Sequence, residues 1–264
     1  MENLKRIFKN VRRLLRAMLL MVCLTFALTG CDEGIDSEKL KPLYDYTQLS
    51  IDEKYTTTEE NGMTISRDES GRVTGIYTFK PSVDGIDKLM NAPTSLEDII
   101  YLFQLSEDYE IRLESTRENA AWEGLPDFLQ YSEVYRQYYK GILVAPGGCQ
   151  IDYFITPQGK RMSNAYIAPF INVKDLNTTP SVTEKQARQV MADYLEVERD
   201  DNWPCNLSIR EFSTRKDGRI VRDVRLVYSI TGPYAPMEPD VWYCMAPRYY
   251  ATVDAHTGQL LLIN

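Results

Sequence analysis

Apolar and polar residues alternate along much of this chain, with the period of two that is typical of half-buried β-strands. Short sequences rich in glycine and aspartate separate the alternating segments and are typical of tight turns. The pattern therefore predicts a series of antiparallel strands. They cover residues 63–67, 72–79, 109–115, 132–144, 149–156, 161–168, 207–213, 220–230 and 248–262, with a break at 256–258.

Two other segments have apolar residues three or four positions apart, which is the spacing of an amphipathic helix. The first follows a capping-box spacing from Thr94 to Glu97, and we expect a helix over about 95–105. The second opens at Ser181–Glu184 by the same spacing and continues to Leu195. Each helix is followed by several strands. We therefore predict an α+β fold made of tandem units, each with a helix packed on a curved antiparallel sheet.

The first thirty residues have the pattern of a secretion signal. Lysine and arginine residues precede the apolar run Ala17–Ala27, which is too short for a comfortable membrane span. The run ends in Leu28-Thr29-Gly30-Cys31, which resembles the lipobox of bacterial lipoproteins. The resemblance implies that Cys31 is lipidated and begins the mature chain, where several acyl chains on one residue give stable anchoring. An ordinary signal peptide or a transmembrane helix with an incidental cysteine is the alternative.

The chain carries 38 acidic and 30 basic residues, which gives a net charge of -8. Removal of residues 1–30 would make it more acidic, because the predicted signal is rich in lysine and arginine. An acidic chain does not neutralise the phosphates of a nucleic acid, and the single histidine, His256, cannot build a two-histidine zinc site. We therefore expect no nucleic-acid partner, no metal site and no cofactor.

Three cysteines follow Cys31 in the predicted mature chain, namely Cys149, Cys205 and Cys244. Cys205 and Cys244 each lie beside a tryptophan in an aromatic-rich segment, and a disulfide between them is one interpretation. Three buried free thiols are the other.

Parts of the second half of the chain resemble a protease propeptide. Tyr135–Val144 resembles the Gln-x-aromatic-x-Gly-Ile-Pro-Val stretch of the fungalysin and thermolysin propeptide (FTP) domain. The opening of the second helix at Pro180–Ala187, Leu226-Val227-Tyr228 and Tyr250–Leu260 resemble the PepSY domain that follows it in those propeptides. The chain departs from the family at Leu143, where proline is usual, and at Ala145–Gly148, where a shorter turn is usual.

The propeptide resemblance covers roughly Leu96–Asn264 and implies a cystatin-like and PepSY-like fold there; together with the patterns that precede it, it predicts a division of the chain into five parts. These parts are a lipoprotein signal peptide (1–30), an acidic tether (31–54), an N-terminal β-meander (55–93), an FTP-like domain (94–178) and a PepSY-like domain (179–264). The His-Glu-x-x-His motif of the peptidases does not occur in the sequence. In the family, such propeptides assist folding of the peptidase and hold it inactive.

We therefore expect a non-enzymatic lipoprotein of the bacterial cell envelope, anchored to the membrane on its extracytoplasmic side. Its expected partner is a protein, in particular an exported peptidase that it inhibits or helps to fold. The alternative is an extracytoplasmic sensor or regulatory subunit of a signalling system.

Four tyrosines in or beside predicted strands are candidate contacts for the protein partner. They are Tyr138, Tyr139, Tyr249 and Tyr250. Aromatic side chains at interfaces bury large areas, but tyrosines that alternate in a sheet with one packed face are the plainer interpretation.

Three arrangements that suggest chemistry are set aside. A catalytic pair with Cys149 as nucleophile and His256 as its base is poorly supported, because His256 lies in a predicted hairpin turn. Glu238 and Asp240 flank a proline, which indicates an exposed turn rather than an acid/base pair. The acidic run 196–201 lacks the glycine-centred spacing of a calcium loop. We expect no catalytic residue.

Overall fold

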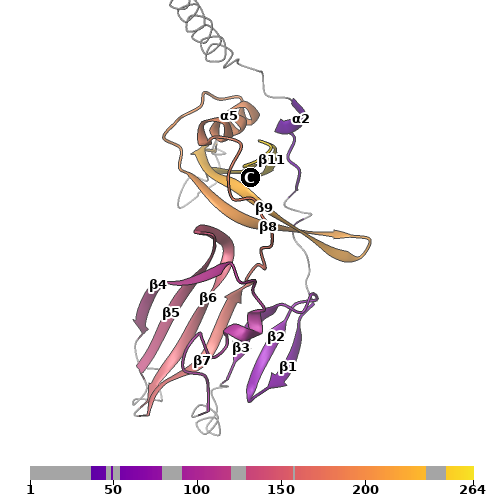
Figure 1. Ribbon diagram of the computed structural model, residues 1–264. Coiled ribbons are helices and arrows are strands. Elements are labelled where there is room, and N and C mark those ends of the chain that lie inside the picture. The colour runs from indigo at the N-terminus through magenta and orange to yellow at the C-terminus, as the bar shows by residue number, and fades with distance from the viewer. Residues whose placement is uncertain are drawn as a thin grey trace, which may run out of the picture. The chain divides into compact units, whose positions relative to one another are not determined.

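The computed structural model describes residues 37–45, 49, 54–78, 91–119, 129–156, 158–235 and 248–264. All of them belong to one compact unit, Ser37–Asn264. Figure 1 shows their helices and strands. In chain order these are α2 (Ser37–Leu40), β1 (Thr56–Glu60), β2 (Met63–Arg67), β3 (Val73–Tyr77), the 3₁₀ helix η2 (Ile100–Phe103), β4 (Tyr109–Asn119), β5 (Leu129–Tyr139), β6 (Ile142–Thr156), β7 (Gly159–Ala168), α5 (Glu184–Leu195), β8 (Cys205–Lys216), β9 (Arg219–Tyr234), β10 (Arg248–Asp254) and β11 (Leu260–Ile263).

The strands form a single eleven-stranded sheet that branches at β6. Along one side, β6 pairs with β5, and β5 pairs with β4. Along the other side, residues 148–156 of β6 pair antiparallel with β7, while Val144 and Ala145 pair parallel with β8. One branch continues from β7 through β3 and β2 to β1, and the other from β8 through β9 and β10 to β11.

The predicted fold of tandem helix-on-sheet units is therefore wrong. The two groups of strands that we expected to form separate sheets are joined into one mixed sheet by the short parallel pairing of β6 with β8. The α-helices whose bounds lie within the described residues are α2 and α5. The protein is mostly β, and only one of the two predicted helices forms.

The helix expected over 95–105 is replaced by the short 3₁₀ helix η2. The buried residues Leu96, Ile99 and Leu102 repeat every three positions, which matches a 3₁₀ helix as well as an α-helix. The backbone N–H of Ile99 donates to Leu96, and that of Leu102 donates to Ile99, in the three-residue pattern of tight turns. The carboxylate of Asp98, and not that of Glu97, accepts from the first backbone N–H groups, at 2.7 Å from Thr94.

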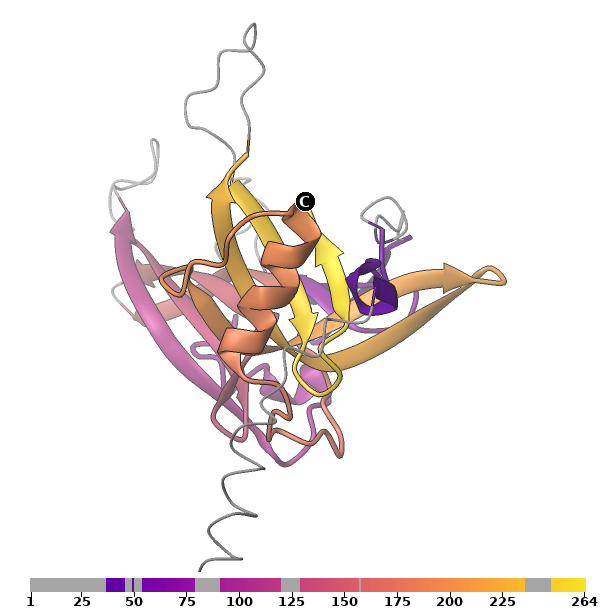
Figure 2. The ribbon, with the colours of Figure 1, turned by 90° about the horizontal axis from the view of Figure 1, so that it is seen from above.

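The second predicted helix is confirmed as α5. Its capping box joins Thr183 to Gln186, so the helix begins two residues later than the Ser181–Glu184 spacing indicated. The buried face includes Ala187, Val190 and Met191, and it packs against β9 and β10. Figure 2 shows α5 lying across this branch of the sheet.

Hairpin turns explain two further differences from the predicted strands. The strand expected over 132–144 is two strands, β5 and β6, because Lys140 and Gly141 form a turn with φ values of 48° and 80°. β1 was not predicted at all, since its Thr-Thr-Thr-Glu-Glu sequence lacks an apolar alternation. Asn61 and Gly62, with φ values of 51° and 77°, join it to β2.

The segment after α2 docks on β11. The backbone N–H of Leu43 donates to Leu260 at 3.0 Å, and that of Tyr44 donates to Leu261 at 2.8 Å. The Tyr44 ring stacks on Phe212, with 4.6 Å between ring centroids. This part of the chain therefore belongs to the packed structure.

One hydrophobic core, here called the η2 core, lies between residues 96–105, here called the η2 segment, and one face of the sheet. Leu96, Ile99 and Leu102 supply the covering layer, and side chains of β2, β3, β6 and β7 supply the sheet face, including Ile65 and Ile151. Within the described ranges, no helix combines the length and hydrophobicity that crossing a bilayer requires.

Candidate protein-binding groove beside strand β4

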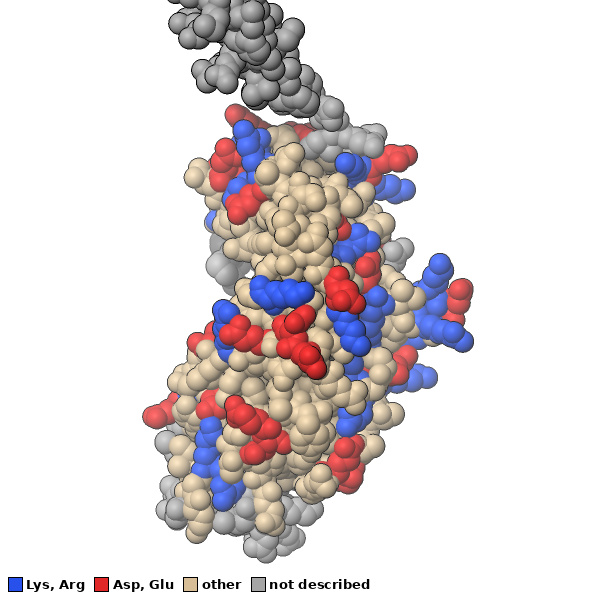
Figure 3. Space-filling view, in the orientation of Figure 1, with Lys and Arg blue, Asp and Glu red and all other residues tan. Residues whose placement is uncertain are grey.

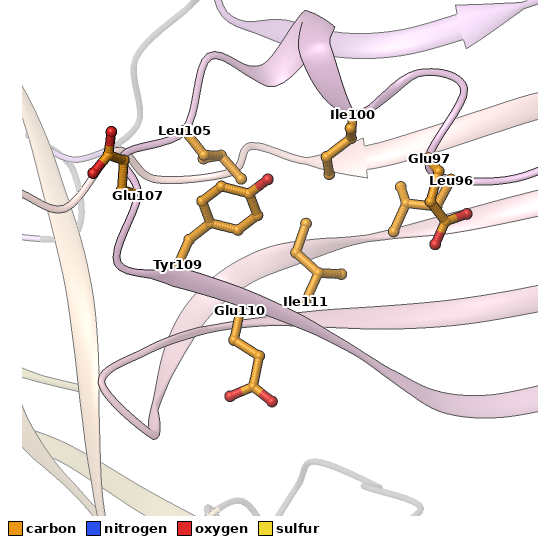
Figure 4. Close-up of a pocket in the computed structure, with 8 residues that line it drawn as sticks. All are labelled: Leu96, Glu97, Ile100, Leu105, Glu107, Tyr109, Glu110 and Ile111. Atoms are coloured by element: carbon orange, nitrogen blue, oxygen red, sulfur yellow. The ribbon is translucent and has the colours of Figure 1, made fainter.

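An open groove of about 620 Å³ lies between the η2 segment and β4. Figure 4 shows the side chains around it. They combine an apolar set with three glutamates: Leu96, Ile100, Leu105, Tyr109 and Ile111, with Glu97, Glu107 and Glu110.

The floor of the groove is apolar because the side chains that form it belong to the η2 core or pack against it. Leu96 is buried, and Ile100, Leu105 and Ile111 pack against the core cluster. In Figure 4, Tyr109 and Ile111 point from β4 toward the η2 segment, whereas Glu110 points away on the other side of the strand. This is the alternation that a β-strand imposes on successive side chains.

Strand β4 forms an edge of the sheet beside this groove. Within the described part of the chain it pairs with β5 alone, so one row of backbone N–H and C=O groups has no strand partner. Leu113 lies two positions after Ile111, and the shift in the pairing register of β4 with β5 comes only after it. Its side chain is therefore on the same face of the strand as that of Ile111, and it is 51% exposed. An unpaired strand edge next to an apolar groove is the arrangement that binds an extended peptide as an added strand.

Charged side chains limit what this edge can bind. Arg112 donates to Glu110 at 2.7 Å, and Arg136 of β5 donates to Glu114 at 2.8 Å. The hydrogen bond from Arg112 is the main cause of a lowered pKa at Glu110. Charges on an edge strand discourage indiscriminate pairing with other strands, so the edge favours a segment with complementary charge.

Glu97 and Glu107 differ from Glu110, because neither has an ion-pair or hydrogen-bond partner among the described residues. Both are exposed. Elsewhere charges are mixed, and Figure 3 shows acidic and basic side chains interleaved over the face in view. The groove therefore carries a local excess of negative charge at its rim.

A partly buried ion pair lies on the same face of the sheet. Lys160 Nζ is 2.6 Å from Glu133 Oε1, and the Tyr135 hydroxyl donates to Glu133 Oε2 at 2.7 Å. Burial raises the pKa of Glu133, but the bonds from Lys160 and Tyr135 outweigh burial and lower it overall. Both carboxylate oxygens are occupied, so this pair ties β5 to β7.

The four candidate tyrosines lie on two strands that are not neighbours. Tyr138 and Tyr139 are at the end of β5, and Tyr249 and Tyr250 are in β10, with β6, β8 and β9 between them in the sheet. Tyr139 is 1% exposed and has little surface for a partner, whereas Tyr250 is 48% exposed. Tyr138 lies beside β4, with the Arg112 guanidinium 4.2 Å from its ring centroid.

The cysteines and the histidine lie in separate surroundings. Cys149 is buried in β6, and burial, with a smaller effect of the Glu133 charge, raises its pKa to about 12. A thiol with this pKa is protonated at neutral pH and is a poor nucleophile. His256 Nε2 lies 3.0 Å from the backbone oxygen of Asn177. In the described part of the chain no hydrogen bond joins Cys149 to His256.

Several predicted residues fall outside the described residues, namely Cys31, Cys244, Glu238 and Asp240. The pairing of Cys205 with Cys244 therefore stays a prediction. Cys205 itself is half-buried, and burial raises its pKa to about 11.

No group of histidine, cysteine and acidic side chains suited to a metal ion occurs among the residues that the structure describes. In the acidic run 196–201, Asp201 accepts from Arg199 at 2.7 Å.

The sequence analysis missed the groove residues Glu97 and Glu107, and it missed Leu113, the exposed apolar residue of the β4 edge. One signal for the edge was present, because Glu110, Arg112 and Glu114 place charges at every second position of β4, as edge strands often do. No protein-family model matches this chain, and no curated protein matches its sequence.

Proposed function

We propose that this chain is a lipoprotein of the bacterial cell envelope that binds a protein partner and catalyses no reaction itself. A lipid on Cys31 would hold it at the membrane on the extracytoplasmic side. Residues 5–31 support the anchor, through their basic segment, apolar run and lipobox-like ending. The observation that carries the binding role is the edge of β4 beside the groove, with which no described strand pairs.

The kind of partner is proposed from the sequence. Tyr135–Val144 and Tyr250–Leu260 resemble the FTP and PepSY parts of peptidase propeptides. We propose that the partner is an exported peptidase, which the chain inhibits or helps to fold. An edge strand suits this role, because a strand added in an extended conformation is bound through its backbone as well as its side chains.

The binding role is tested by capture of partners with the full lipidated chain from its own cell envelope. The informative variant is Leu113→Lys, which puts a charge on the exposed apolar position of the β4 edge. Val221→Lys is the matched control, since Val221 is an exposed apolar residue of β9, at 45% exposure. We expect Leu113→Lys to lose the captured protein and Val221→Lys to retain it. Retention by both variants would contradict binding at β4.

The peptidase role needs a separate measurement. The captured peptidase is assayed, and is also refolded from denaturant, with and without the purified mature chain. We expect slower proteolysis or a higher yield of refolded enzyme, and the Leu113→Lys variant should lack the effect. Stable capture of a membrane kinase, with no effect on proteolysis, would instead indicate a subunit of a signalling system.

A further inference from the structure

The groove beside β4 also restricts the chemistry of the segment that binds there. We infer that it binds an extended segment of the partner in which an apolar side chain lies between two basic ones. This inference rests on the proposed function, because it concerns the same edge and the same partner.

The apolar requirement follows from the floor of the groove. Ile100, Leu105 and Ile111 line it, and they remain in contact with the core on one side while the groove is open on the other. A volume of about 620 Å³ is within the usual range of small-ligand pockets. An apolar side chain in this space would exclude water from the three residues, which is favourable.

The basic requirement follows from the two rim glutamates. In Figure 4, Glu97 and Glu107 lie at opposite ends of the groove, with the apolar side chains between them. The basic residues close to the groove along the chain are already paired. Arg112 binds Glu110, and Lys140 lies 3.6 Å from Asp108. Cations on the partner are therefore the natural complement of Glu97 and Glu107.

The extended conformation follows from the edge itself. β4 runs for eleven residues, Tyr109–Asn119, and offers alternating backbone donors and acceptors along the side that no described strand occupies. In an added strand, residues on one face are two positions apart. An apolar side chain can then enter the groove while basic side chains on the same face reach its two ends.

A second copy of this chain is a poorer occupant than a basic segment. Two copies paired through β4 would bring the Glu97 and Glu107 rims of both molecules together, and like charges oppose such a contact. The net charge of -8 adds to the repulsion.

Synthetic peptides test the chemistry directly. The probe is a short fluorescein-labelled peptide of threonine and serine, with a central leucine and a lysine two positions to each side. Two matched peptides carry glutamine or glutamate in place of both lysines. Binding to the mature chain is measured by fluorescence anisotropy at low and at raised ionic strength. We expect the lysine peptide to bind best and its affinity to fall as salt increases.

The double variant E97Q/E107Q tests the rim. An exposed ion pair contributes roughly 0.2–1 kcal/mol, so the loss of two should weaken binding of the lysine peptide by about 2- to 30-fold. The variant should leave binding of the glutamine peptide unchanged. E196Q/E198Q is the matched control, because both residues lie beyond α5 and outside the groove. This control should bind the lysine peptide as the unmodified chain does.

Backbone methylation tests the added strand. The lysine peptide is made with N-methyl groups on every second residue, in both possible alternations. An added strand bonds to β4 along one side only, so one alternation should abolish binding and the other should retain it. Equal binding by both methylated peptides would overturn strand addition.

Other outcomes would overturn the charge requirement. Equal binding of the three peptides would do so. Binding of the lysine peptide to E97Q/E107Q with the same affinity as to the unmodified chain would also do so. A dimer in sedimentation experiments that Leu113→Lys dissociates would assign the edge to a second copy. If the peptides fail while Leu113→Lys still loses the captured protein, this inference is wrong and the proposed function stands.

Discussion

Replacing Asp68 with asparagine would remove one charge from a closed ring of four ionised side chains. Arg72 Nε and Arg222 Nη2 lie 3.2 and 3.1 Å from Asp68 Oδ2. The same two arginines bind Glu211, at 3.0 and 3.1 Å. The ring joins the turn between β2 and β3 to strands β8 and β9. We expect Asp68→Asn to destabilise this junction.

The magnitude follows from the burial of the ring. The Asp68 side chain has no exposed surface, whereas those of Arg72 and Arg222 are 22% and 17% exposed. Removing one partner of a fully buried ion pair costs about 3–5 kcal/mol, and an exposed pair contributes about 0–1 kcal/mol. Because the arginines keep some contact with water, we expect a loss of about 2–3 kcal/mol.

Asparagine preserves part of the local structure. Asp68 Oδ1 accepts from the backbone N–H groups of Ser70 and Arg72, at 2.8 and 3.1 Å, and an amide oxygen can do the same. The measured loss should therefore report on the ring more than on the turn. For a folded unit of this size, each kcal/mol lowers the melting temperature by about 2–4 °C, so the expected shift is about 4–12 °C.

Thermal and urea unfolding of the mature chain measure this effect. Glu60→Gln is the control, because the pair of Glu60 with Arg67, at 3.1 Å, is more exposed, with 39% of the glutamate side chain accessible. We expect Glu60→Gln to destabilise the fold much less than Asp68→Asn, because solvent screens an exposed pair. Equal losses in the two variants, or a loss at Asp68 below about 0.5 kcal/mol, would refute the reasoning.

The same ring predicts a dependence on pH. Burial raises the pKa of Asp68, but hydrogen bonds from Ser70 and Arg72 outweigh burial and lower it overall. A carboxyl with a lowered folded-state pKa stabilises the fold above its unfolded value of about 3.9, and this contribution is lost as pH falls through the folded-state pKa. The chain should lose stability below about pH 4, and Asp68→Asn should reduce that pH dependence. An unchanged pH profile in Asp68→Asn would contradict this assignment.

Two further predictions concern the junction at β6 and the anchor. A Cβ at Gly148 would lie 2.6 Å from the backbone oxygen of Tyr135, so Gly148→Ala should cost about 1–3 kcal/mol in urea unfolding. Gly232→Ala should cost less, since its Cβ would meet the flexible end of Met191, and equal losses would count against the backbone clash. Cys31→Ser should abolish incorporation of labelled palmitate and release the protein from membranes, whereas continued labelling would place the lipid elsewhere.

Features that depend on a few consecutive residues were predicted well. The capping residues and apolar spacing that precede Leu195 predicted α5, because a helix satisfies its backbone hydrogen bonds within its own segment. Most strands were also located correctly, from alternation and turn composition. The division of 132–144 into two strands could also have been predicted, since Lys140-Gly141 forms a two-residue hairpin turn with positive φ at both positions.

The 95–105 segment shows where local pattern becomes ambiguous. Its apolar residues fit both an α-helix and a 3₁₀ helix, and the burial of Leu96, Ile99 and Leu102 against the sheet decided between them. Isoleucine, tyrosine and phenylalanine are only moderate helix formers, so local propensity did not oppose the tighter turns.

The sequence by itself determined most of the extended segments, with β1 as an exception, where α5 begins and ends to within about two residues, and the motif on which the proposed lipid at Cys31 rests. Only the tertiary structure decided that β6 joins both groups of strands through Val144 and Ala145, and that β4 has one neighbour among the described strands, beside the groove. The reason is physical. Alternation records which face of a strand is buried, but strand pairing is made by backbone groups that every residue shares, so the identity of the neighbour is set by distant parts of the chain.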